Sequence, residues 1–216
     1  MNFSEIDFYL VFDMFLLLLI GMGPKIALVP FLELTQGMEP DRQRKVADIM
    51  VKTAVFTALL LVVLGWFLMR LLHFTPGAAN IAGGIVLLLL ALHMLVSPGK
   101  SKTDHHEKAS NRSAMQMAIY PLAVPYLLNP AGIAALVIAS DDVDSVLFGV
   151  ILVGLVLLVG ALDFAVFRNM DKLSKYLDPS RLAITEAVFG VLLAALAVQL
   201  MVDGLAELGV ITAVAH

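Results

Sequence analysis

The sequence predicts an all-α membrane protein of six transmembrane helices, arranged as two inverted three-helix repeats in which helices one and four are broken. Three observations lead to this fold class. First, 60% of the 216 residues are hydrophobic and 15% are charged, whereas soluble domains carry about a quarter charged residues. Second, the apolar residues lie in six long runs. Third, a single offset of 106 residues aligns the two halves of the chain.

Each apolar run is close to the length of about 20 residues that a helix needs to cross the hydrocarbon core of a bilayer. A soluble protein can bury one such run in its core, but not six in succession. We therefore expect one membrane domain over residues 1–216, with almost no folded mass outside the bilayer. The expected spans are 8–32, 47–72, 77–96, 114–139, 146–167 and 183–204.

The connections between the spans differ strongly in charge. Those after spans one, three and five carry eleven Lys and Arg residues, whereas Arg70 stands alone on the opposite side. Lys and Arg favour the cytoplasmic side of a membrane. We therefore expect both termini outside a plasma membrane, which in bacteria is the inner membrane.

A polar segment divides the chain into two halves. Residues 97–113 predict a flexible cytoplasmic linker between repeat one, residues 8–96, and repeat two, residues 114–204. At the 106-residue offset Pro24 aligns with Pro130. Because each half has an odd number of spans, the halves enter the membrane from opposite sides, a plan that is common among secondary transporters.

Glycine and proline interrupt the first span at 21–24 and the fourth at 129–132. Proline removes a backbone donor, but it suits the first turn of a new helix, as Asn suits its cap. Each break then offers a half-helix N-terminus that can hold an anion. A packing kink is the alternative for either break alone, and two matching breaks favour a site. The predicted substrate-binding residues are Gly23, Pro24, Lys25, Ile26, Asn129, Pro130, Ala131, Gly132 and Ile133.

Two charged residues lie deep within spans. Lys25 is 17 residues beyond Phe8, and Asp163 is 17 residues beyond Val146, a depth of about 25 Å on parallel spans. They are candidates for an ion pair or gate. The alternative for Lys25 is that its side chain reaches along the span to the inner interface.

Several classes of protein are not supported by the sequence. The chain has no cysteine, its spans contain no motif such as His-Glu-x-x-His, and no basic cluster suits nucleic acid. The run 104–107 has metal-ligand residue types, but within a polar linker it is interpreted as a solvated segment. We expect no enzymatic activity, no cofactor, no metal site and no nucleic-acid partner.

The breaks carry a resemblance to a known family. Residues 23–31 are similar to a motif of the type Asn-Pro-x-Gly-x-x-Pro-x-Phe, and residues 129–133 to one of the type Gly-Pro-Gly-Ala-Ile. Over nearly its whole length the chain resembles the MarC family, which includes SnatA-type small neutral amino-acid transporters and belongs to the wider LysE transporter group. Here Gly23 replaces the usual Asn or Asp, and Lys25 follows the proline.

The resemblance implies a multi-pass transporter of a small solute, with a small neutral amino acid as the leading substrate and alternating access around the two breaks. The alternatives are an efflux or metal-ion permease of the same wider group, and a structural or regulatory membrane subunit that does not transport. Membrane lipid is an expected partner, and a homo-oligomer stays open. The sequence identifies neither the coupling ion nor the direction of transport.

Overall fold

The computed structural model describes residues 8–96, 113–141, 146–170 and 179–212, and every regular element in these ranges is helical. The elements are α1 (Phe8–Met22), α2 (Pro24–Thr35), α3 (Pro40–Leu72), α4 (Pro76–Val96), α6 (Ala114–Met117), η2 (Ala118–Leu127), α7 (Pro130–Asp141), α8 (Val146–Arg168) and α10 (Pro179–Glu207).

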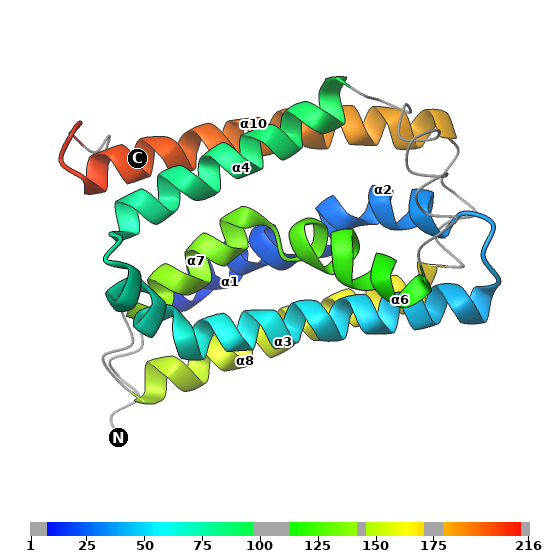
Figure 1. Ribbon diagram of the computed structural model, residues 1–216, viewed down its shortest axis with the longest axis horizontal. Coiled ribbons are helices and arrows are strands. Elements are labelled where there is room, and N and C mark those ends of the chain that lie inside the picture. Colours follow the sequence, from blue (N-terminus) through cyan, green and yellow to red (C-terminus); the bar gives the residue numbers. More distant parts are fainter. Residues whose placement is uncertain (1–7, 97–112, 142–145, 171–178, 213–216) are drawn as a thin grey trace.

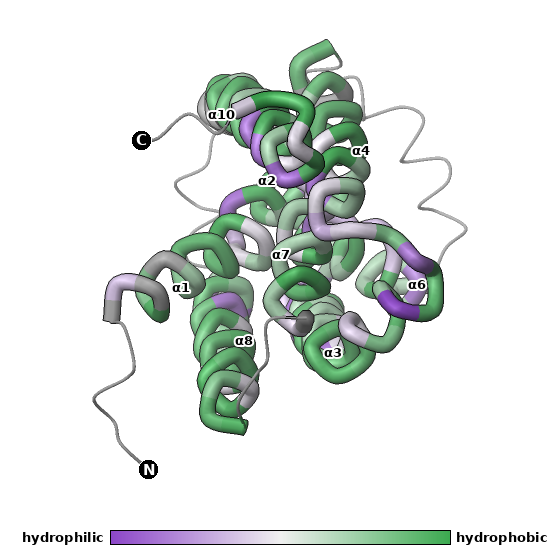
Figure 2. The backbone as a smooth tube through the Cα atoms, turned by 90° about the vertical axis from the view of Figure 1, so that its left-hand side faces the viewer, coloured by the Kyte–Doolittle hydropathy of each residue, from purple (hydrophilic) through white to green (hydrophobic). Residues whose placement is uncertain are grey.

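The helices form three layers (Figures 1 and 2). The α4 and α10 helices make one outer layer, and α3 and α8 make the other. The broken helices, α1–α2 and α6–η2–α7, lie between them. Figure 1 also shows that α1 begins, and α10 ends, at the same end of the molecule. The structure is therefore that of a chain whose successive long helices run back and forth between two ends.

The outer surfaces of the layers are apolar. In α3 the buried positions recur every four residues at Val46, Met50, Ala54, Ala58 and Val62, which form one helix face. The other faces expose large apolar side chains at Phe56, Leu60, Val63 and Phe67. Figure 2 shows that most residues along the long helices are hydrophobic. A helix that is apolar on every side suits lipid on its outer face.

Four described helical stretches are long and apolar enough to cross a membrane, namely Met14–Thr35, Pro40–Leu72, Val146–Arg168 and Gly190–Glu207. The bent pair Ala114–Leu127 and Pro130–Ser140 is a fifth candidate. The apolar part of α4, Pro76–Leu92, is shorter. The structure thus supports a multi-pass membrane protein, and the sixth span stays a prediction.

The predicted linker 97–113 lies outside the described residues except for Ser113. This serine caps the second half of the chain, since its side chain accepts a hydrogen bond from the Gln116 N–H and its N–H donates to the Gln116 side chain. Such a reciprocal cap marks where a helix begins.

The α4/α10 pair is held by small residues that face one another every seven positions. Gly77 lies against Gly204, Gly84 against Ala197, and Ala91 against Gly190. A Cβ atom built on Gly77 or Gly84 would lie 2.7 Å from the facing backbone oxygen. Small residues at membrane helix interfaces let two backbones approach closely in this way. We refer to α4 and α10 together as the α4/α10 pair.

Candidate functional site

Both predicted breaks are present, and they differ in sharpness. Gly23 alone separates α1 from α2, with an extended backbone (φ −79°, ψ 167°), and the stretch from Met14 to Thr35 still qualifies as one span. The second break bends the chain by 69°. The η2 segment before it contains two non-helical residues, Tyr120 and Val124, each directly before a proline. Proline disfavours helical geometry in the residue that precedes it, so these prolines loosen the helix ahead of the break.

The two breaks meet in the middle layer. A Cβ atom on Gly21 would clash with the Gly132 Cα, and one on Gly132 with the Gly21 backbone, so both positions need glycine for this approach. Pro24 has no N–H, and the Ile20 carbonyl therefore loses the donor that would follow it in a continuous helix. The Asn129 Nδ2 donates to this Ile20 oxygen at 2.8 Å instead. Prolines and glycines far apart in sequence thus build one junction.

Asn129 uses its polar groups within this junction. Its backbone N–H donates to the Gly21 oxygen at 2.9 Å, and its Oδ1 accepts from the Gly132 N–H at 3.0 Å, which caps the start of α7. The side chain is fully buried. In this conformation Asn129 therefore joins the two broken helices and caps one of them.

The start of α2 has no such cap. Gly23 holds the position that corresponds to Asn129 at the 106-residue offset, and it contributes no side-chain hydrogen bond. In the first turn of α2, Lys25 is exposed and Ile26 is buried. Of the two half-helix N-termini, the one at α2 is therefore free of a side-chain cap.

An apolar cluster covers the junction. Ile26 from the first turn of α2 and Ala131 from the first turn of α7 pack against the α4/α10 pair. Their partners are Leu87, Ala91, Leu193, Ala197 and Leu200. Of the nine predicted site residues, all but Lys25 are buried or half-buried at this place. The structure thus brings the predicted residues together and covers them, so we call this conformation closed.

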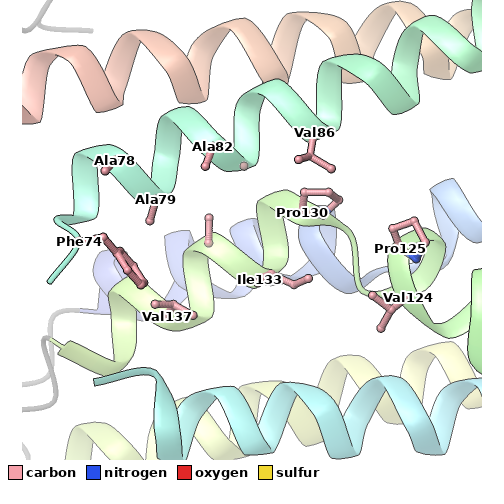
Figure 3. A pocket seen from close by; sticks show the side chains of 12 residues that line it. Phe74, Ala78, Ala79, Ala82, Val86, Val124, Pro125, Pro130, Ile133 and Val137 are labelled. Carbon is pink, nitrogen blue, oxygen red and sulfur yellow. The ribbon is translucent and has the colours of Figure 1, made fainter. Parts of the chain in front are cut away.

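A cavity of about 660 Å³ lies beside the junction, between α4 on one side and η2 and α7 on the other (Figure 3). Two predicted residues, Pro130 and Ile133, line it. Small residues on α4 leave the space, because Ala78, Ala82 and Gly83 project little beyond the backbone. The cavity was not predicted, although the many Gly and Ala residues within 77–84 are the sequence signal that marks it.

Lys25 and Asp163 do not form an ion pair in this structure. Asp163 is fully buried, and neither carboxylate oxygen has a hydrogen-bond partner. Lys25 is exposed. The guanidinium of Arg168, five residues beyond Asp163, lies over the Phe164 ring, with its Cζ atom 5.3 Å from the ring centre. A gate that closes in another conformation stays a prediction.

The described residues contain no group of three or more His, Cys, Asp or Glu side chains that could hold a metal ion. The run 104–107 lies outside them.

Comparison with known proteins identifies relatives along almost the whole chain. Residues 8–208 match the sequence model of the MarC family of integral membrane proteins. A UPF0056 membrane protein of Methanocaldococcus jannaschii is 25% identical over 85% of this chain and 90% of its own. One from Aquifex aeolicus is 27% identical, covering 90% and 91%, and a UPF0056 inner membrane protein of Shigella flexneri is 25% identical, covering 88% and 92%. No solved structure matches the chain.

Proposed function

Because the chain belongs to the MarC family of integral membrane proteins, we propose that it carries a small solute, first of all a small neutral amino acid, across the membrane by alternating access. The observation that carries this proposal is the meeting of two broken helices in the buried middle layer. Irregular backbone at membrane depth is tolerated where it is packed in protein or lines a cavity, and in transporters it marks the binding site.

The helix boundaries support an inverted repeat. At the 106-residue offset α2 (Pro24–Thr35) corresponds to α7 (Pro130–Asp141) at both ends, and the first residue of α3 to the first residue of α8. The facing pair Gly84 and Ala197 becomes Gly190 and Ala91, which also face each other. Two copies of one unit, related by an axis in the membrane plane, would give these correspondences and the six spans of the prediction.

The same arrangement suggests which parts move. The α4/α10 pair is joined closely within itself and rests on the junction through the apolar cluster around Ile26 and Ala131. The cavity lies between this pair and α7. In the proposed mechanism the α4/α10 pair rocks against the other helices and uncovers the junction towards one side and then the other.

The uncapped start of α2 supports an amino acid as substrate. A carboxylate there would meet free N–H groups and the positive end of the helix, and Lys25 would add its charge. The enclosing residues Ile26, Leu87, Ala131 and Leu193 are apolar, which suits a neutral substrate side chain rather than a charged one. The basic residues in the connections after spans one, three and five support a topology in which both termini lie on the outer side of the membrane.

Reconstitution in liposomes tests the proposal, with labelled glycine, alanine and serine against lysine and divalent metal ions as competitors. Uptake or counterflow of the neutral amino acids is the expected result. Absence of both for every amino acid would overturn it and leave the two alternatives, a permease for another solute or a subunit that does not transport.

A crosslink tests the mechanism, since the chain has no cysteine of its own. A Cβ on Gly83 lies 3.1 Å from the Ala134 Cβ across the moving interface, and one on Gly160 lies 3.8 Å from the Val55 Cβ between α3 and α8. Both pairs are near the separation of roughly 3.5–4.5 Å in disulfides. Oxidised Gly83→Cys/Ala134→Cys should stop transport reversibly, while Val55→Cys/Gly160→Cys should not. Equal transport by both oxidised variants would contradict the rocking motion.

A further inference from the structure

Asp163 is a buried acid that the proposed mechanism does not yet use. Its side chain has no exposed surface, and both carboxylate oxygens lack a hydrogen-bond partner. A charged carboxylate in an apolar interior is unfavourable unless it is paired, and ionisable residues in membrane spans are usually functional. A group in this environment is stable in its neutral, protonated form.

The position of Asp163 relates it to the junction. Asp163 follows Gly160 by three residues and precedes Phe167 by four, so the three lie on one face of α8. A Cβ on Gly160 would lie 3.9 Å from the Met22 Cε, just before the first break. The Phe167 ring meets the Phe31 ring on α2, with their centres 5.1 Å apart. Asp163 therefore lies level with the first turn of α2, which follows the break.

Other charged groups do not satisfy Asp163. The elements that pack against α8 are α1, α2 and α3. Their charged residues are Asp13, Lys25, Glu33, Asp41, Arg42, Arg44, Lys45, Asp48, Lys52 and Arg70. The structure gives neither oxygen of Asp163 a hydrogen bond to any of them. Lys25 is level with it, but is exposed on α2.

We propose that Asp163 is the proton-binding residue that couples transport to a proton gradient. In the closed structure its carboxyl group holds one proton, because the apolar surroundings do not stabilise the charge. When the α4/α10 pair rocks away and uncovers the junction, water that enters there reaches the carboxyl, which gives this proton to a water molecule and becomes a carboxylate. Reprotonation from the opposite side permits closure again. No other bond changes, and one proton crosses in each cycle.

A proton fits this site better than a metal cation does. Cations such as calcium take six or more oxygen ligands, and the described residues contain no cluster of three acidic or histidine side chains. The inference rests on the proposed transport function, so its test needs one measurement that does not depend on transport.

Infrared spectroscopy of the purified full-length protein supplies that measurement. A protonated carboxyl has a C=O stretching band that a carboxylate lacks. We expect such a band in the parent protein at neutral pH, its loss in Asp163→Asn, and a shift in Asp163→Glu. The control is Asp203→Asn, because Asp203 is exposed and bonded to Gln199 at 2.7 Å. Absence of an Asp163 band would overturn the proposal.

Transport supplies the second measurement. In liposomes with an imposed pH gradient, the parent protein should accumulate labelled alanine. The Asp163→Asn variant should lose this accumulation but should still exchange internal for external alanine. Accumulation by this variant, or accumulation driven by a sodium gradient alone, would overturn the coupling role. If the parent carried no amino acid, the proposed function and the coupling would fail together, while the infrared band would still report whether Asp163 binds a proton.

Discussion

Asn129 is the residue whose replacement tests the junction most directly. Its side chain makes two hydrogen bonds, to the Ile20 oxygen at 2.8 Å and from the Gly132 N–H at 3.0 Å, and it is fully buried. Asn129→Leu keeps a side chain of similar size but leaves that oxygen and that N–H without partners. Each lost bond costs about 1–2 kcal/mol in proteins, with about 0.6 kcal/mol as the average in membranes. We expect the Leu variant to lose about 1–4 kcal/mol of unfolding free energy.

Two further variants separate the two bonds from a general effect. Asn129→Ser retains a helix cap for α7 but is too short to reach the Ile20 oxygen, so about half of the loss is expected. Asn80→Leu is the matched control, since Asn80 makes one 3.2 Å bond to the exposed Glu207. Unfolding in mixed micelles with increasing denaturing detergent gives the free energies. If Asn129→Leu were as stable as Asn80→Leu, Asn129 would not hold the breaks together.

The remaining predictions concern the charge at the break, the helix packing and the topology. Lys25→Met should raise the KM for alanine about two- to fivefold, because a charge near a helix end contributes about 0.3–1 kcal/mol of binding free energy. Lys25→Arg keeps the charge and should leave the KM unchanged. An unchanged KM in Lys25→Met would mean that the lysine side chain only extends to the membrane interface. Gly204→Leu should cost about 1–3 kcal/mol by overpacking, because a Cβ there meets the Gly77 oxygen at 2.5 Å, whereas Gly154→Leu meets nothing within 4 Å and should be tolerated. Tags on both termini should react with an impermeant reagent in intact cells. Labelling only after lysis would mean that the termini face the cytoplasm.

Much of the fold could be predicted because membrane insertion leaves few choices. Apolar runs of the required length give helices, and prolines within them give breaks, so α1–α2 and η2–α7 were predictable as broken helices. The relation of Pro24 to Pro130 also predicted that the two breaks belong together. The sharper bend of the second break was not predicted, although Pro121 and Pro125 already remove two donors there.

The directions of the side chains were harder to predict. Lys25 and Asp163 were expected at one depth, and the structure puts them level with each other, but one is exposed and the other is buried. In a soluble helix the polar residues show which face is exposed and which is buried. A span that is apolar on every side gives no such information about its orientation around the helix axis. Asn129 was predicted as a substrate-binding residue, and that role stays a prediction. Its bond to a carbonyl 109 positions away was not foreseen, because it depends on how two distant breaks pack together.

That long-range bond has a consequence for how the protein is made. The ribosome delivers α1 and α2 to the membrane well before Asn129 has been synthesised, and until then the Ile20 and Gly21 carbonyls lack the donors that α7 will bring. Lipid offers them no substitute. The first half of the chain therefore enters the bilayer with these two carbonyls unpaired, and water, the insertion machinery or a second copy has to supply their hydrogen-bond donors. The first broken helix is fully hydrogen-bonded only after the second half of the chain has been inserted.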